Sequence, residues 1–199
     1  MIQSQNEFSK VLGRDHPYVY KIHLKLGEIY SRRKHYQEAE EVVGHSIELL
    51  SKLDPEDPNH HHLAQPYLSL GLINLKQGIY DAAERYFKEC LSLLNKGRND
   101  ANPDFANCYN QLSDLYSEMA KRHDSNPDLF EFYTVESLCQ LALEMREKAL
   151  EIYEKLFDEP NVRTALCLSH IARLAINCGK DFEYVYITYM DALAIFSKI

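Results

Sequence analysis

Apolar residues along this chain recur every three to four positions, in stretches separated by short polar or glycine-containing breaks. The first stretch covers residues 19–33 and places Ile22, Leu26, Ile29 and Tyr30 on one face of a helix. The same spacing predicts further helices over residues 36–53, 63–77, 80–96, 105–121, 129–157, 162–178 and 182–199. The pattern therefore predicts an all-α protein.

The breaks between these helices group them into pairs. Residues 33–35, Gly78 and Gly179 form short links, whereas residues 54–62 and 99–104 are longer polar connectors that contain prolines. Short links favour antiparallel packing of the two helices that they join. We therefore expect one domain over residues 1–199 made of helical pairs, with repeats at about residues 18–53, 63–96, 105–157 and 162–199 and an inserted loop over residues 121–134.

One sequence motif occurs twice. Leu26-Gly27 is followed by Tyr36 and by Ala39-Glu40, and 44 residues later Leu70-Gly71 is followed by Tyr80 and by Ala83-Glu84. Self-similarity at a period of about 20–50 residues indicates stacked repeats, which bury their apolar faces only against each other. The corresponding positions on the first helix of each pair hold small residues, and these are Gly27, Gly71, Ser113 and Ala172. A small residue there lets the facing helix come close.

These residues resemble the pattern of tetratricopeptide repeat (TPR) proteins. The second repeat carries the pattern at Tyr67, Leu70, Gly71, Tyr80, Ala83, Phe87 and Cys90. Residues 10–19, with Lys10-Val11-Leu12-Gly13 and His16-Pro17, are similar to the linker between the repeats of kinesin light chains. The resemblance implies an α-solenoid of antiparallel helix pairs, a TPR-like right-handed superhelix, that acts as a protein-protein interaction module.

In this family the first helix of each pair lines a concave groove that binds a peptide segment or helix of a partner. The resemblance carries this role to Lys21, Leu24, Glu28, Arg32, Leu68, Leu72, Leu75, Asn107, Asn110, Asp114 and Arg173. Leu68, Leu72 and Leu75 form a stripe separate from the packing face, which suits an apolar ligand. Lys21, Arg32 and Arg173, against Glu28 and Asp114, would set its polarity.

Two sets of residues with which members of this family bind their ligands are absent from the sequence. The asparagine that light-chain repeats carry before the leucine pair is replaced by Lys25, Ser69, Gln111 and His170. Leu24 and Glu28 stand where other members place a lysine and an asparagine around a partner's terminal carboxylate. The resemblance therefore does not imply a receptor for chaperone tails.

An alternative is that the chain covers its own leucine stripe. The inserted loop over residues 121–134 carries Phe130, Phe132 and Tyr133, which suit either a plug for the groove or a contact for a partner. Two other readings stay open. The chain could be a scaffold or regulatory subunit that docks through its edges, or a regulatory segment of a larger enzyme. Residues 6–12 look like the end of an earlier helix and the last helix has no polar cap, so a homo-oligomer or a larger array is a further expectation.

The composition and charge of the chain argue against several classes of function. The net charge of −8 argues against nucleic-acid binding, and no apolar run has the roughly 20 residues that span a bilayer. The five cysteines form no C-x-x-C pair and fall within predicted helices, which suggests buried free thiols in the cytoplasm. Residues 60–62 are three adjacent histidines in a connector with no cysteine nearby, and adjacent histidines on a regular helix cannot all face one ion. We therefore expect no metal site. Without a catalytic motif we expect no catalytic residue, no cofactor and no enzyme activity.

Overall fold

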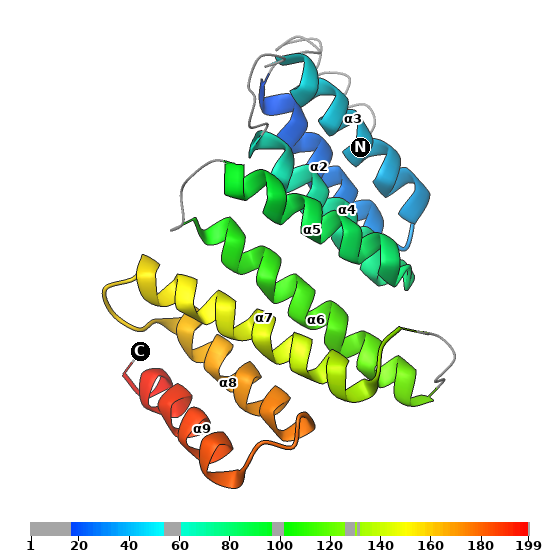
Figure 1. Cartoon of the computed structure of the whole chain (residues 1–199). Helices are drawn as coiled ribbons and strands as arrows, with labels where there is room; N and C mark the ends of the chain where they lie inside the picture. The colour runs from blue at the N-terminus through cyan, green and yellow to red at the C-terminus, as the bar shows by residue number, and fades with distance from the viewer. Residues whose placement is uncertain (1–16, 54–60, 97–101, 126–129, 131, 199) are drawn as a thin grey trace. The chain divides into compact units, whose positions relative to one another are not determined.

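The computed structural model describes residues 17–53, 61–96, 102–125, 130 and 132–198. Within these ranges the chain forms eight α-helices and one 3-10 turn and contains no strand. Figure 1 shows the helices in chain order. The all-α prediction is confirmed. The predicted helix end over residues 6–12 and most of the linker over residues 10–19 lie outside the described part of the chain.

Every predicted helix has a counterpart in the structure. The helices are α2 (Pro17–Arg32), α3 (Tyr36–Leu53), α4 (Ala64–Gln77), α5 (Tyr80–Lys96), α6 (Pro103–Ser125), α7 (Val135–Leu156), α8 (Val162–Asn177) and α9 (Phe182–Phe196), with the 3-10 turn η1 (His61–Leu63) before α4. Tight left-handed turns at Gly78 and Gly179, both with positive φ, follow α4 and α8. These turns reverse the chain between the two helices of a pair.

The chain divides into two compact units, which we describe separately. Unit 1 is Met1–Arg98 and contains α2 to α5; unit 2 is Asn99–Ile199 and contains α6 to α9. In unit 1 the pairs are α2 with α3 and α4 with α5, and both α2 and α3 also contact α4. In unit 2 the pairs are α6 with α7 and α8 with α9, and α7 contacts α8. Each unit is thus a stack of two helical hairpins, the packing expected of TPR-like repeats.

The small residues in unit 1 are needed for close helix packing. A Cβ atom on Gly27 would lie 2.5 Å from Val43 Cγ2, and one on Gly71 would overlap the ring of Phe87. Val43 and Phe87 are fully buried in the second helix of their pairs. Glycine in a helix costs about 0.5–1 kcal/mol relative to alanine, and the packing of these side chains offsets that cost.

The two hairpins of unit 1 share an apolar core and a buried polar contact. The core contains Ala39, Val43, Leu70 and Ile73, contributed by α3 and α4. Beside it, Glu40 Oε1 accepts hydrogen bonds from Asn74 Nδ2 at 3.1 Å and Gln77 Nε2 at 2.6 Å. Glu40 therefore joins α3 to α4 across the interface between the two repeats.

The boundary between α6 and α7 differs from the prediction. α6 continues to Ser125, beyond the predicted end at residue 121, and α7 begins at Val135 instead of at residue 129. Thr134 caps α7, because its Oγ1 accepts from Ser137 N at 3.1 Å while Ser137 Oγ accepts from Thr134 N at 2.9 Å. This reciprocal cap fixes the first turn of α7 and ends the inserted loop there.

The aromatic residues of the inserted loop have different environments. Phe130 is buried and its ring stacks on that of His123, with 6.4 Å between centroids. Because His123 belongs to α6, this contact fixes Phe130 within unit 2. Phe132, two residues later, is 92% exposed. The two phenylalanines therefore do not form one continuous plug.

Candidate functional site

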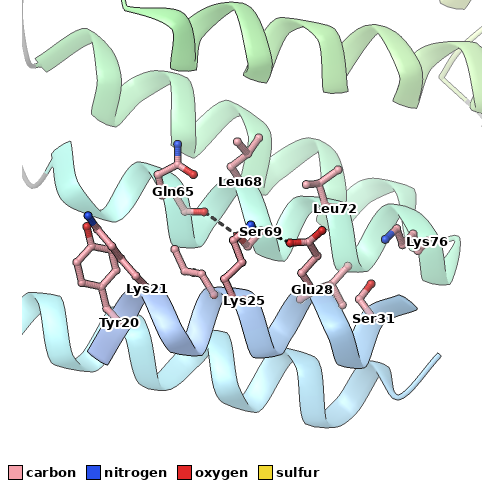
Figure 2. A pocket seen from close by; sticks show the side chains of 12 residues that line it. Tyr20, Lys21, Lys25, Glu28, Ser31, Gln65, Leu68, Ser69, Leu72 and Lys76 are labelled. Atoms are coloured by element: carbon pink, nitrogen blue, oxygen red, sulfur yellow. Dashed lines mark hydrogen bonds and ion pairs between the residues drawn. The ribbon is translucent and has the colours of Figure 1, made fainter. Parts of the chain in front are cut away.

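A pocket of about 390 Å³ lies between α2 and α4 in unit 1. Figure 2 shows its charged side chains along α2, with Gln65, Leu68 and Leu72 on α4 beside them. The lining residues are Tyr20, Lys21, Leu24, Lys25, Glu28, Ser31, Gln65, Leu68, Ser69, Leu72, Ile73 and Lys76. We call this the α2–α4 groove. It is formed by the first helices of two neighbouring pairs.

Leucines and an isoleucine form the apolar part of the α2–α4 groove. Leu68 and Ile73 are buried, and Leu72 is half-buried. Leu24, also half-buried, packs against the core of unit 1. Because these side chains are supported by the core, the apolar lining is held in place by the same contacts that stabilise the fold.

Charged side chains surround this apolar lining. Lys21, Lys25 and Lys76 are exposed, and Glu28 is the one acidic residue of the lining. Glu28 accepts from Lys25 Nζ at 3.2 Å and from Arg32 Nη2 at 2.6 Å. The hydrogen bond and charge of Lys25, with a smaller contribution from Arg32, lower the pKa of Glu28 below its usual value. The groove therefore presents a net positive rim, although the chain as a whole is acidic.

Ser31 adds a polar group to the α2–α4 groove. It is only 3% exposed, and its Oγ has no hydrogen-bond partner among the described residues. A buried hydroxyl without a partner costs free energy, about 1–3 kcal/mol. Ser31 lines the pocket, but its Oγ is itself covered, so a ligand group reaches it only when the neighbouring side chains shift.

Five of the predicted groove residues of unit 1 line this pocket. They are Lys21, Leu24, Glu28, Leu68 and Leu72. Arg32 and Leu75 are not among the lining residues, and Arg32 instead pairs with Glu28. Since Gly27 and Gly71 are equivalent, the counterpart of Leu75 in the first repeat is Ser31. The sequence prediction assigns Arg32, the next residue, to the groove and therefore does not include Ser31.

Two of the predicted groove residues of unit 2, Asn110 and Asp114, are hydrogen-bonded to an arginine from the second helix of the pair. Arg146 of α7 is 5% exposed. Its Nη1 donates to Asn110 Oδ1 at 2.8 Å, its Nη2 to Asp114 Oδ1 at 2.5 Å, and its Nε to Ser113 Oγ at 3.3 Å. Asn110 Nδ2 also donates to Tyr153 Oη at 3.0 Å. Asn110 and Asp114 are therefore part of the internal structure of unit 2.

The other two predicted residues of unit 2, Arg173 and Asn107, lie outside this network. Arg173 is exposed on α8, and Asn107 is half-buried on α6. Burial lowers the pKa of His170, the charges of Arg146 and Arg173 lower it further, and Asp114 opposes them. Within unit 2, Arg173 and Arg146 therefore both act electrostatically on His170.

Metal binding and membrane spanning each require a particular arrangement of residues. No group of three or more His, Cys, Asp or Glu side chains in these ranges is placed to hold a metal ion. None of the described helices is long and apolar enough to cross a membrane.

Comparison with known proteins identifies the repeat. The tetratricopeptide repeat family model matches residues 64–93, which cover α4 and most of α5. Residues 64–93 are therefore similar to a tetratricopeptide repeat. No curated protein matches the whole sequence significantly.

Solved structures extend the similarity from one TPR to the fold of the chain. BtubC (BKLC) from P. vanneervenii has a TM-score of 0.70 at 18% identity, over 90% of this chain and 64% of that protein. A second structure, from Podosopora anserina, is described as kinesin light chain TPR-like repeats that are nearly identical to one another. It has a TM-score of 0.59 at 16% identity, over 92% of this chain and 77% of that protein. A single-substitution variant of those repeats gives 0.61 at 17% identity, with the same coverage. These similarities confirm the TPR-like solenoid fold, and this chain spans less than two thirds of BtubC.

Proposed function

We propose that this chain is an adaptor-type protein-protein interaction module whose α2–α4 groove binds a peptide segment or short helix of a partner protein. One observation carries the proposal. The groove combines apolar side chains supported by the core with Ser31 Oγ, a buried polar atom without a partner in the described structure. Pockets with a mainly apolar lining and a few placed polar groups are typical binding sites. The TPR-like fold supports a protein partner in general.

The lining determines which ligand would fit. Leu24, Leu68 and Leu72 favour an apolar side chain of the ligand, and fully burying one leucine-sized group contributes roughly 1.5–3 kcal/mol. Ser31 favours a ligand backbone or side-chain group that can pair with a hydroxyl. The chemistry of the groove therefore favours a short apolar motif over a flat polar surface.

The rim favours acidic residues beside that motif. Lys21, Lys25 and Lys76 outnumber Glu28, and all four are exposed. Exposed charges contribute modestly to affinity but steer association, and at about 0.1 M salt they are largely screened beyond about 10 Å. We therefore expect binding to weaken as ionic strength rises, mainly through a slower association rate.

We assign the chain no catalytic role and place it in the cytoplasm. Its five cysteines are all free, and four of them are buried in the described structure. Buried free thiols are typical of proteins in a reducing compartment. The predicted role does not require a cofactor.

A peptide selection tests this function. Random 12-residue peptides displayed on phage would be selected on the immobilised chain, and the enriched peptides measured by calorimetry against the parent and Leu72→Asp. Replacing the leucine removes apolar contact and places a carboxylate beside the ligand, so we expect affinity to fall at least about tenfold.

Leu91→Asp is the matched control, because Leu91 is a half-buried leucine of α5 outside the α2–α4 groove. Circular dichroism must show that both variants remain folded. Equal affinity of the enriched peptides for the parent and Leu72→Asp, or the absence of any enriched peptide, would contradict the proposed function.

A further inference from the structure

The outer face of α9 is the most apolar exposed surface among the described helices. Large exposed apolar side chains on this helix are Phe182, Tyr184, Tyr186, Ile187, Tyr189, Met190, Leu193 and Phe196. Figure 1 shows α9 at the edge of unit 2, beside α8. Among the described helices α9 packs against α8, and a hydrogen bond from Tyr184 joins it to α7. A helix that is apolar on nearly every side is normally covered on nearly every side.

The inner face of α9 is already used. Thr188 and Ala192 are buried, and Tyr184 Oη donates to Glu147 Oε1 of α7 at 3.1 Å. These residues are spaced by four and face α8 and α7. The remaining large side chains therefore belong to surfaces that unit 2 does not cover.

Five of the exposed residues form a regular seam. Phe182, Tyr186, Tyr189, Leu193 and Phe196 are separated alternately by four and three positions, the spacing of a helix that packs lengthwise on another helix. The rings of Phe182 and Tyr186 already stack, with 5.9 Å between centroids. We call these five residues the α9 seam.

We propose that the α9 seam pairs with the α9 seam of a second copy of this chain, with the two helices antiparallel. This inference is independent of the α2–α4 groove, which lies in unit 1. The seam is nearly symmetric about Tyr189, because Phe182 and Phe196 lie seven positions to either side while Tyr186 and Leu193 lie three and four positions away. A two-fold axis at Tyr189 places Phe182 opposite Phe196 of the second copy and Tyr186 beside its Leu193. A two-fold interface requires such a self-complementary surface.

The size of the apolar surface suits a weak, reversible dimer. Exposed fractions over the five seam residues range from 40% for Tyr189 to 81% for Phe182. With about 180 Å² of surface per side chain and roughly half of it exposed, pairing removes about 500 Å² per copy from water. The total of about 1,000 Å² is near the smallest area expected of a biological interface and fits reversible association.

Charge at the helix ends also favours the antiparallel orientation. The N-terminal end carries Lys180, Asp181 and Glu183, and the C-terminal end carries Lys198; all four are exposed. The two ends therefore have opposite net charge and meet in the proposed register. The helix dipoles are also antiparallel in this arrangement.

Sedimentation velocity over a wide range of protein concentration tests the proposal. We expect the chain to associate reversibly into a dimer and Leu193→Glu to raise the dissociation constant at least about tenfold, because each dimer loses two leucine contacts. Phe182→Glu provides a second disrupting variant, since a residue that is 81% exposed can be changed without disturbing the fold.

The matched control is Phe132→Glu, which changes a phenylalanine of unit 2 that is 92% exposed and lies outside α9. We expect it to dimerise like the parent. A parent chain that stays monomeric at every concentration would overturn the proposal, as would Leu193→Glu and Phe182→Glu variants that dimerise as the parent does. Capture of α9 by a different protein would appear as a monomeric parent and would count against it.

Cysteine cross-linking tests the orientation, in a Cys178→Ser background that removes the half-buried native thiol. In the antiparallel register Tyr189→Cys cross-links to its own copy, and Phe182→Cys cross-links to Phe196→Cys in a mixture of the two variants. Efficient cross-linking of Phe182→Cys to itself, with no product in the mixture, would indicate parallel helices and contradict the register.

Discussion

Glu28 of unit 1 and Asp114 of unit 2 occupy the same repeat position, directly after the small residue of the first helix. Their side chains are about equally exposed, at 42% and 46%. Glu28 pairs with Lys25 and Arg32, exposed residues of its own helix, whereas Asp114 pairs with Arg146, whose side chain is 6% exposed. The same position is therefore part of a solvated rim in unit 1 and of the internal packing in unit 2.

The small residue beside each carboxylate explains this difference. In unit 1 an apolar side chain fills the close approach at each small residue: Val43 lies against Gly27, which precedes Glu28, and the ring of Phe87 lies against Gly71. In unit 2 Ser113 Oγ donates to Ala142 O at 2.7 Å and accepts from Arg146, so a polar contact occupies the corresponding interface. A change from glycine to serine is thus coupled to a change from an open groove to an arginine-bonded face.

Exchanging the small residue is expected to have the largest effect. Gly71→Ser brings a Cβ and a hydroxyl against Phe87, and we expect the free energy of unfolding to fall by about 2–3 kcal/mol. Chemical denaturation measures this change. Gly44→Ser is the matched control, because nothing lies within 4 Å of a Cβ at that helical glycine. We expect it to be neutral or slightly stabilising, and an equal loss at both sites would contradict the packing argument.

Removing the carboxylate is expected to have the second-largest effect on stability, and that effect should differ between the two units. Asp114→Ala leaves the buried guanidinium of Arg146 without its charged partner, so we expect a loss of about 2 kcal/mol in the free energy of unfolding. Glu28→Ala removes only exposed ion pairs and should cost less than about 0.5 kcal/mol. Equal losses in denaturation would show that the two positions are energetically alike. The double variant Asp114→Ala/Arg146→Met should recover part of the loss, because no charge is then left buried.

The smallest effect concerns a histidine near Arg146. Asp114 raises the pKa of His170 against burial and the charges of Arg146 and Arg173. Asp114→Ala should therefore lower the pKa of His170 further, which NMR titration of the imidazole protons measures. Because the folded pKa lies below 6.5, stability falls as the pH drops through 6.5 toward the folded value, and the variant should widen this window.

His23 of unit 1 is the internal control for that titration. Burial and the charge of His45 lower its pKa, and Asp114 is not among the causes. Its pKa should be the same in the parent and in Asp114→Ala. A shift of His23 equal to that of His170 would mean that the substitution disturbs the chain as a whole.

The sequence was sufficient to predict the helices, because their apolar spacing is a local property. It misplaced the start of α7, since the apolar residues at 129 and 130 continue the helical spacing while the cap at Thr134 depends on Ser137, a less common partner than glutamate. Leu68 and Leu72 could be assigned to a groove from spacing and resemblance alone. Arg146 could not be foreseen, because its bonds to Asn110 and Asp114 join residues more than 30 positions apart.

The central claim is that the first-helix face binds a ligand in unit 1, whereas in unit 2 the corresponding residues are bonded to Arg146. Leucine-methyl NMR spectra, recorded while a selected peptide is titrated into the chain, test it most directly. We predict that the methyl signals of Leu24, Leu68 and Leu72 shift together and that those of Leu141 and Leu168, which are half-buried in unit 2, do not move. Shifts confined to the leucines of unit 2, with Leu68 and Leu72 unchanged, would contradict the account.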